Sequence, residues 1–206
     1  MIVGLTGGTG TGKTLISEYF KDFGFEVIDY DKITREIYHK GSDCLNEIVS
    51  AFGEDILTES GELERRKLGS IVFSSKEKLD ILNEIVYKYI LEKTKKQIEE
   101  GKYKKLLLDA PTLFEAGLNK ECDYVVGVIA DKKLRLQRIC ERDGLDRESA
   151  INRILSQKDD EFYQKNCHYI IENSGNLEEL KVKTEKIIRS ICKWILQQGK
   201  TKKHFT

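Results

Sequence analysis

The residues best suited to chemistry form a glycine-rich octet close to the start of the chain, Gly7-Gly8-Thr9-Gly10-Thr11-Gly12-Lys13-Thr14. The octet matches the pattern G-x-x-x-x-G-K-[ST] of a phosphate-binding loop. Glycines permit backbone conformations in which successive N–H groups converge on phosphate oxygens, and a helix that follows adds its N-terminal dipole. Lys13 can reach the β- and γ-phosphates, and the Thr14 hydroxyl can ligate Mg²⁺. The pattern predicts a nucleoside triphosphate site between a strand and a helix.

An acidic segment, Asp29-Tyr30-Asp31, ends the second predicted strand, about one βαβ unit after the loop. The carboxyl ends of neighbouring strands in an open parallel sheet face the same crevice. A carboxylate at Asp31 can therefore orient an acceptor hydroxyl and accept its proton. The alternative is that Asp31 caps a helix.

A second acid, Asp109, follows the apolar residues 106–108. A carboxylate at the end of such a strand can hold the metal or its waters. The alternative is a turn residue ahead of Pro111, the chain's only proline.

Three arginines, Arg135, Arg138 and Arg142, recur at i, i+3 and i+7 on one helical face, and Arg153 lies on the next predicted helix. Inward-facing arginines on such a helix–turn–helix suit a lid that closes over phosphates and stabilises transition-state charge. The alternative is a solvated basic face whose arginines pair with nearby glutamates, Glu141 and Glu148.

The elements that must position these residues follow from apolar runs, turn residues and caps. Strands are predicted at residues 2–5, 26–29, 105–109, 124–129 and 169–171. Helices are predicted at residues 13–23, about 76–100, from Asp131 to Asp143, about 146–160, and 177 to about 198. Strand, helix and strand in this order imply a right-handed crossover and a parallel sheet. Residues 31–101 show helical periodicity only, so we expect a helical insertion there.

Composition narrows the class of protein. The 206 residues include 39% hydrophobic and 34% charged residues, and 35 basic residues balance 35 acidic ones. Zero net charge argues against a whole-surface nucleic-acid or membrane binder. The five scattered cysteines form no CxxC pair, which favours free thiols in a reducing compartment. Without a signal-peptide pattern or an apolar run of ~20 residues, we expect a soluble cytoplasmic protein, a monomer or a small homo-oligomer.

Taken together and in order, these segments resemble the dephospho-coenzyme A kinase family over nearly the whole chain. The likeness is carried by residues 4–8, 12–14, 27–31 with Arg35, 61–65, 68–69, 72–73, 109–117, 153–157 and 173–177. The strongest segment after the loop is Asp109-Ala110-Pro111-Thr112-Leu113-Phe114-Glu115-Ala116-Gly117. The chain departs from the family at Glu64 (usually Asp), at Tyr30 (usually Ala) and at Tyr87-Lys88, where the family commonly carries His-Pro.

The resemblance implies an α/β P-loop NTPase fold of the nucleoside-monophosphate-kinase type, a parallel sheet flanked by helices. It implies one domain with a core (about 1–30, 102–134 and 166–206), a helical substrate insertion (about 31–101) and a lid (about 135–165). The implied reaction moves a phosphoryl group from ATP, with Mg²⁺, to the ribose 3′-hydroxyl of dephospho-coenzyme A. No nucleic acid or membrane partner is implied.

The resemblance also implies roles for individual residues. Asp31 matches the family's proposed base, Lys13 its phosphate clamp, and Arg138 or Arg142 a lid arginine. The implied ATP-binding residues are Gly8, Thr9, Gly10, Thr11, Gly12, Lys13, Thr14, Leu15, Asn173 and Gly175. The implied substrate-binding residues are Thr6, Asp31, Arg35, Arg65, Asp109 and Pro111. The metal would be held by Thr14 and Asp109.

Two other functions remain open from the residues alone. One is a P-loop kinase of another small acceptor, such as a nucleoside monophosphate or shikimate. The other is a nucleotide-dependent switch that grips a partner. For the switch, the guanine-reading pattern Asn-Lys-x-Asp is missing, since the segment from Asn119 to Cys122 lacks the final acid.

Overall fold

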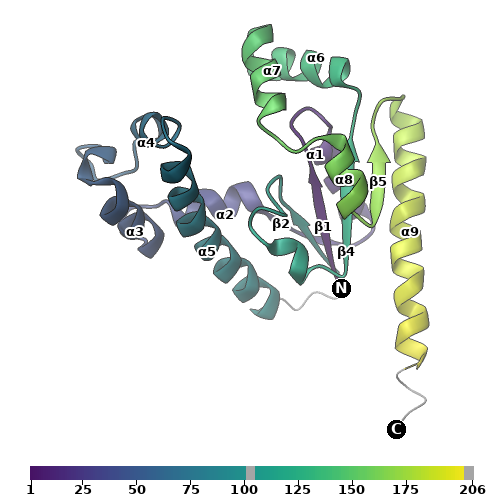
Figure 1. The fold of residues 1–206 in the computed structure, drawn as a ribbon. Coiled ribbons are helices and arrows are strands. Elements are labelled where there is room, and N and C mark those ends of the chain that lie inside the picture. The colour runs from purple at the N-terminus through teal and green to yellow at the C-terminus, as the bar shows by residue number, and fades with distance from the viewer. Residues whose placement is uncertain (101–104, 202–206) are drawn as a thin grey trace. The chain divides into compact units, whose positions relative to one another are not determined.

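The computed structural model describes residues 1–100 and 105–201, with side chains described as far as residue 193 (Figure 1). Its centre is a five-stranded sheet in the order β2-β3-β1-β4-β5. The strands are β1 (Ile2–Gly7), β2 (Glu26–Asp29), β3 (Leu106–Asp109), β4 (Tyr124–Ile129) and β5 (Tyr169–Glu172). β1 pairs in parallel with both β3 and β4, and β4 pairs in parallel with β5. All five predicted strands are confirmed, with ends that differ by at most two residues.

The chain divides into two compact units. The first contains Met1–Ile28, Tyr103–Leu113 and Glu121–Thr206, and the second contains Asp29–Lys102 and Phe114–Lys120. The helices of the first unit are α1 (Lys13–Asp22), α6 (Lys132–Asp143), α7 (Arg147–Leu155), α8 (Asp160–Asn166) and α9 (Leu177–Thr201).

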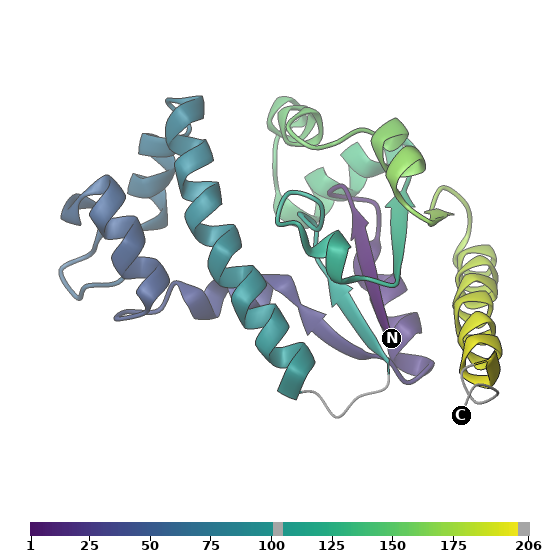
Figure 2. The same cartoon turned by 60° about the horizontal axis from the view of Figure 1, so that its bottom comes forward.

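The core of the first unit joins the sheet to helices α1 and α9, which can be followed in Figure 2. Its fully buried members include Val3, Leu5, Ile16, Phe20, Leu107, Val126, Val128, Ile188 and Ile191. Strand residues that are apolar on both faces suit a parallel sheet covered by helices. The packing fixes the end of β1, and with it the start of the glycine-rich loop.

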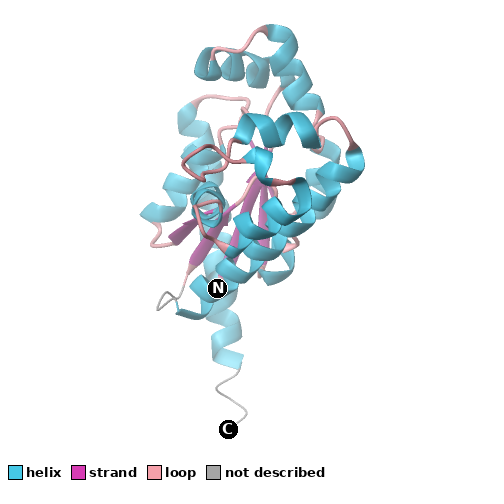
Figure 3. Ribbon diagram, turned by 90° about the vertical axis from the view of Figure 1, so that its left-hand side faces the viewer, coloured by secondary structure: helices cyan, strands magenta, loops and turns pink. Residues whose placement is uncertain are grey.

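The second unit is helical, as Figure 3 shows by colour. Its elements are α2 (Tyr30–Ile37), α3 (Asp43–Phe52), the 3₁₀ turn η1 (Glu54–Ile56), α4 (Arg65–Val72) and α5 (Lys76–Glu100), with most of a second 3₁₀ turn, η2 (Leu118–Glu121). Helices α2, α3 and α4 all pack against α5. Within the described part of residues 31–101 the only β-type pairing is the isolated bridge Leu57–Leu63, so the prediction of a helical segment without a strand is confirmed.

One predicted helix was wrong. The helix expected from about residue 146 to 160 ends at Leu155, and a separate helix, α8, begins at Asp160. Asp159 caps α8, since its carboxylate accepts a hydrogen bond of 2.8 Å from the Phe162 N–H. An aspartate that binds the amides of the next turn favours a helix start over helix continuation.

Among the described residues, no helix is both long enough and apolar enough to cross a membrane.

Candidate active site

The glycine-rich loop joins the carboxyl end of β1 to the first residue of α1. Gly10 and Gly12 have φ angles of 77° and 85°, which side chains rarely adopt. A Cβ at Gly12 would lie 2.2 Å from the Asn173 amide nitrogen. Glycine at position 12 is therefore required both by the backbone conformation and by the close approach of another segment.

Three side chains from outside the loop donate hydrogen bonds to three consecutive loop carbonyls. The bonds are Arg135 Nε to Thr9 O (2.9 Å), Arg138 Nη1 to Gly10 O (3.2 Å) and Asn173 Nδ2 to Thr11 O (2.8 Å). In a trans peptide the C=O and the following N–H point in opposite directions. Each bond therefore turns the next amide N–H away from the donating side chain. This arrangement orients the Gly10 and Gly12 N–H groups as a phosphate cradle requires. The Thr11 N–H instead donates to the Gly8 carbonyl at 3.3 Å.

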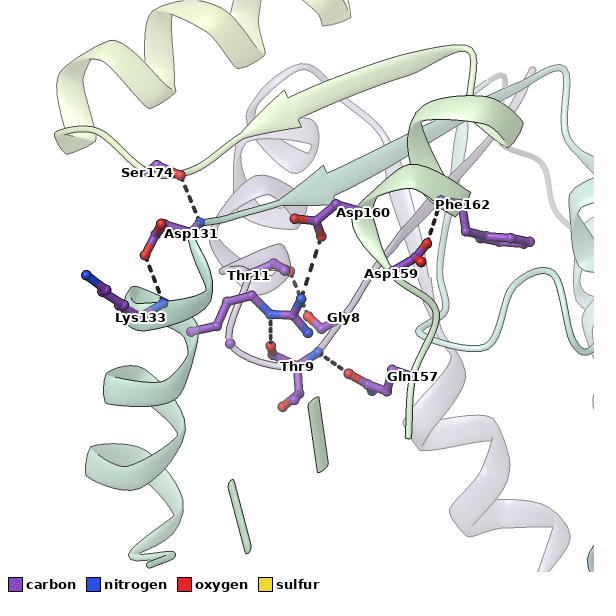
Figure 4. A network of polar contacts seen from close by, with 12 residues as sticks. Gly8, Thr9, Thr11, Asp131, Lys133, Gln157, Asp159, Asp160, Phe162 and Ser174 are labelled. Atoms are coloured by element: carbon purple, nitrogen blue, oxygen red, sulfur yellow. Dashed lines mark hydrogen bonds and ion pairs between the residues drawn. The ribbon is translucent and has the colours of Figure 1, made fainter. Parts of the chain in front are cut away.

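Gln157 also contacts the loop, since its Oε1 accepts a 2.7 Å hydrogen bond from the Thr9 N–H. Figure 4 shows Gln157 reaching Thr9 from the segment that leads into α8. The Thr11 hydroxyl donates to the Gly8 carbonyl at 2.8 Å. Sequence reasoning assigned no role to Gln157, because nothing local links it to a loop 148 positions away.

Lys13 donates a hydrogen bond to the Asp109 carboxylate, and the two side chains are 16% and 15% exposed. The register of the sheet explains the contact, since Asp109 pairs with Leu5 of β1, two residues before the loop. Asp109 is thus engaged with the loop lysine and is not simply a turn residue. The described residues contain no group of three or more His, Cys, Asp or Glu side chains that could hold a metal ion. Mg²⁺ is commonly held by one or two protein oxygens together with substrate phosphates, so the hydroxyl of Thr14 and the carboxylate of Asp109 fit this metal.

The three arginines of the predicted stripe lie in three different environments. Arg135 is 2% exposed and has its carboxylate partner, Asp160, at 3.6 Å. Burial lowers the pKa of the Arg135 guanidinium, and the nearby Asp160 and Tyr163 partly oppose this change. Arg138 is half-buried, and besides the loop it donates to the Asn173 carbonyl at 3.3 Å.

Arg142, at the end of the stripe, is exposed. It forms hydrogen bonds of 2.7 and 3.0 Å with Asp143, and its guanidinium lies 3.5 Å from the Thr9 hydroxyl. Arg153 also binds Asp143, at 2.5 Å. Hydrogen bonds from Arg142 hold the pKa of the Asp143 carboxyl below its usual range. The stripe therefore pairs with aspartates and loop oxygens rather than with Glu141 and Glu148.

In the second unit, helix α2 begins with its own cap. The Asp29 carboxylate accepts hydrogen bonds from the N–H groups of Asp31 (2.9 Å) and Lys32 (3.2 Å). The N-cap is thus Asp29, and Asp31 is an exposed acid in the first turn. Arg35, one turn further on, is exposed as well.

The other predicted substrate arginine, Arg65, begins α4 and lies over the ring of Tyr38, with 5.6 Å between guanidinium carbon and ring centroid. Burial raises the pKa of Tyr38 to about 12, with Cys44 adding to the rise and Arg65 opposing it. Sequence reasoning missed Tyr38, because an aromatic residue after a helix carries no distinctive local signal.

The segment Tyr87-Lys88, which replaces the family's His-Pro pair, lies inside helix α5. Lys88 forms a 2.9 Å ion pair with Glu47 of α3, and the neighbouring Tyr89 hydroxyl donates to the same carboxylate at 2.7 Å. Both hydrogen bonds hold the pKa of the Glu47 carboxyl below its usual range. Residues 88 and 89 thus tie α5 to α3.

The remaining predicted residues lie in β1 (Thr6), in α1 (Leu15) and just before α9 (Gly175). The hydroxyl of Thr6, which is fully buried, donates to the Pro111 carbonyl at 3.2 Å. Leu15 is partly buried against the core of the first unit. Gly175 precedes α9, and a Cβ there would meet Glu179 at 2.7 Å.

Comparison with known proteins gives these features a family. The family model described as dephospho-CoA kinase matches residues 1–179. The chain belongs to the dephospho-CoA kinase family. It is 42% identical to the dephospho-CoA kinase of Fusobacterium nucleatum over 191 residues (93% of this chain, 98% of the relative). It is 39% identical to that of Arabidopsis thaliana over 201 residues (94% and 86%).

Solved structures support the same family and fold. A dephospho-CoA kinase from Campylobacter jejuni superposes with a TM-score of 0.68 at 30% identity, covering 93% of this chain and 97% of that one. A shikimate kinase from Acinetobacter baumannii superposes with a TM-score of 0.53 at 19% identity, covering 93% of each chain, and shows likeness of fold alone. The expected P-loop kinase fold and the resemblance to the dephospho-CoA kinase family are both confirmed.

Of the site residues predicted from the sequence, the structure brings three into direct contact with the loop or its lysine, Lys13. They are Asp109, Arg138 and Asn173. The structure places Asp31, Arg35 and Arg65 in the other compact unit. Gln157 and the buried Arg135 are additional loop contacts. The sequence signals that pointed to them were the helical spacing of Arg135 and Arg138 and the family-like segment 153–157, which ends at Gln157.

Proposed function

We propose that this protein transfers the γ-phosphoryl group of ATP to the ribose 3′-hydroxyl of dephospho-CoA, which gives CoA and ADP as the last step of CoA biosynthesis. The proposal rests on a complete phosphate-binding loop between β1 and α1, in a chain whose residues 1–179 match the dephospho-CoA kinase family model. In the reaction a bond forms between the acceptor oxygen and γ-phosphorus. The bond between γ-phosphorus and the β–γ bridging oxygen breaks, and ADP leaves.

ATP binding is assigned to residues 8–15, with Asn173 and Gly175. The side chains behind the loop carbonyls aim the loop amides at phosphate oxygens, and Lys13 supplies positive charge to the β- and γ-phosphates. Because Lys13 contacts Asp109 in this structure, ATP binding must draw its ammonium group toward the phosphates. Preorganised donors of this kind stabilise charge without the cost of reorganising at the moment of reaction.

The general base is assigned to Asp31. Its carboxylate is exposed, and Asp29 rather than Asp31 caps α2, so the Asp31 oxygens remain available to a hydroxyl. As the acceptor oxygen attacks, its proton passes to the Asp31 carboxylate. Proton transfer by a positioned side chain contributes typically about 10²–10⁴-fold to rate.

Thr14 and Asp109 are the residues that would hold Mg²⁺, directly or through waters. When bound, this ion neutralises charge that develops on the transferring phosphoryl group and the leaving ADP. Arg142 is the lid arginine suited to contact the phosphates, because it is exposed and already lies near the Thr9 hydroxyl. Arg138 has a supporting part, since its guanidinium is engaged with the Gly10 and Asn173 carbonyls.

The helical unit is assigned to the acceptor. Arg35 and Arg65 are exposed cations that suit the phosphate groups of dephospho-CoA, and Tyr38 holds Arg65 by a cation–π contact. Thr6 acts through Pro111, whose carbonyl its hydroxyl binds. We place the reaction in the cytoplasm, where thiols persist, because all five cysteines are present without disulfides.

The test is an assay of phosphoryl transfer from ATP to dephospho-CoA with wild type, Asp31→Asn and Asp43→Asn. Asp43 is the matched control, since it too is an exposed acid in the first turn of a helix. We expect kcat to fall by about 10²-fold or more in Asp31→Asn and to stay unchanged in Asp43→Asn. A fully active Asp31→Asn would remove the base assignment.

The acceptor is tested separately with a thermal-shift panel of dephospho-CoA, AMP and shikimate, each with ADP. The true acceptor should raise the melting temperature most, because only ligands of the native state stabilise it. Absence of wild-type transfer to dephospho-CoA, with a larger shift from AMP or shikimate, would favour a kinase of another small acceptor.

A further inference from the structure

Arg135 is a charged side chain buried against the outer side of the phosphate-binding loop. It is 2% exposed and contacts the loop at consecutive positions. Its Nε donates to the Thr9 carbonyl at 2.9 Å, and a Cβ at Gly8 would lie 2.4 Å from its Nη2. A Cβ at Gly10 would meet the Arg135 backbone carbonyl at 2.8 Å. The absence of side chains at two loop positions therefore makes room for this one arginine.

Burial of this guanidinium is only partly compensated. Its ion-pair partner, Asp160, is at 3.6 Å, and the buried Nη2 has no hydrogen-bond partner among the described residues. Asp160 Oδ1, the oxygen of this ion pair, makes no hydrogen bond there either. A buried cation that is incompletely paired costs stability that an apolar residue of similar volume would not. A structural role alone therefore explains an arginine at this position poorly.

The contact that Arg135 does make has a defined geometry. Arg135 binds the Thr9 carbonyl. Gln157 binds the Thr9 N–H at 2.7 Å, as Figure 4 shows. Both backbone groups of one loop residue are thus fixed from outside. Because the peptide that joins Thr9 to Gly10 is trans, the carbonyl bond to Arg135 turns the Gly10 N–H in the opposite direction.

We propose that Arg135 is a positioning residue for ATP binding, which acts by orienting the Thr9–Gly10 peptide so that the Gly10 N–H faces the bound phosphates. The inference rests on the proposed function, since it assigns the loop to ATP. Arg135 does not touch the nucleotide. Its effect passes through the backbone of Thr9, so its loss raises the KM for ATP more than the KM for dephospho-CoA.

The test compares Arg135→Gln with Lys133→Gln. Lys133 lies on the same helix and is exposed, so the control introduces the same residue and removes one positive charge without touching the loop. For each protein, the KM for ATP, the KM for dephospho-CoA, kcat and the melting temperature are measured. Loss of a hydrogen bond donated by a charged group predicts at least about a fivefold rise in the KM for ATP of Arg135→Gln. The KM for dephospho-CoA should change by less than about twofold.

A purely structural role would lower the melting temperature and the active fraction while leaving both KM values near those of wild type. That outcome, or a rise in the KM for ATP that Lys133→Gln shares, overturns the proposal. If Arg135→Gln does not melt cooperatively above the assay temperature, Arg135→Lys takes its place. Arg135→Lys keeps the charge but has a methylene at the position of Arg135 Nε, the atom that donates to Thr9. A rise below about threefold in its KM for ATP overturns the proposal. Absence of transfer by wild type would instead count against the proposed function.

Discussion

Replacement of Asn173 by aspartate isolates the hydrogen bond that joins the end of β5 to the phosphate-binding loop. Asn173 is 5% exposed, and its amide donates to the Thr11 carbonyl at 2.8 Å. Its own N–H donates to the Ile129 carbonyl at 2.8 Å, so the backbone at this position is held independently of the side chain. Asn173→Asp keeps the shape of the side chain and changes one donor into an acceptor.

The expected loss of stability follows from the new carboxylate and the Thr11 carbonyl, two acceptors that then face each other. The lost hydrogen bond contributes about 1 kcal/mol net, and a buried carbonyl left unsatisfied costs about 1–3 kcal/mol more. We therefore expect Asn173→Asp to lower the free energy of unfolding by about 3 kcal/mol at pH 8. The negative charge near the loop also opposes bound phosphates, so the KM for ATP should rise by about tenfold, equivalent to about 1.4 kcal/mol.

The pH dependence of this variant has a defined sign. Burial and the facing Thr11 carbonyl raise the pKa of the new carboxyl in the folded state above its unfolded value. The folded state then binds more protons than the unfolded state between these two pKa values. Stability relative to wild type is therefore highest below the unfolded pKa and is lost as the pH rises through the raised folded pKa. The protonated acid can donate to Thr11 as the amide does.

Urea unfolding at pH 5 and pH 8 measures both effects. The matched control is Asn46→Asp, which makes the same substitution at an exposed position near the start of α3. We expect the destabilisation of Asn173→Asp to be smaller at pH 5 than at pH 8, and the control to be nearly silent. A loss below about 1 kcal/mol at pH 8, or a loss equal at both pH values, would refute the geometry described for Asn173.

Three further predictions test other parts of the site. Asp109→Asn should raise the Mg²⁺ concentration needed for half-maximal activity by about tenfold. An unchanged Mg²⁺ requirement would show that Asp109, which contacts Lys13, does not hold the metal. Iodoacetamide at pH 8 should modify Cys122 and Cys167 about 1,000-fold more slowly than ordinary thiols, because burial raises their pKa from 9.0 to about 12; mass spectrometry of native and unfolded protein checks this. Asp131→Ala should cost about 1 kcal/mol in urea unfolding, because the Asp131 carboxylate caps α6 through the Lys133 N–H at 2.8 Å; an unchanged midpoint would contradict that cap.

Much of the fold could be predicted because its signals are local. Each strand is a short apolar run, and each of several helices begins at a side chain that binds its own first turn, as Asp131 and Asn176 do. Local signals failed where two of them competed. One helix was predicted to continue through residues 156–159, but Asp159 caps a new helix there, and the predicted long helix is replaced by two.

The partners of the site residues could not be predicted in the same way. The choice between Asp29 and Asp31 as the N-cap depends on where β2 ends, and only the folded backbone decides it. The arginine stripe could be recognised by its spacing. Its division into a buried, a half-buried and an exposed member depends on the packing of α6 against the loop.

The sequence by itself determined the chemistry at the start of the chain. The glycines, Lys13 and Thr14 lie within eight consecutive residues, so their spacing alone indicates a phosphate-binding loop. The tertiary structure decided what holds that chemistry in place. Thr11 receives its bond from a residue 162 positions away, and Thr9 is held from 126 and 148 positions away by Arg135 and Gln157. Such contacts arise only when strands and helices pack, because no local pattern records which distant side chain will meet a backbone carbonyl.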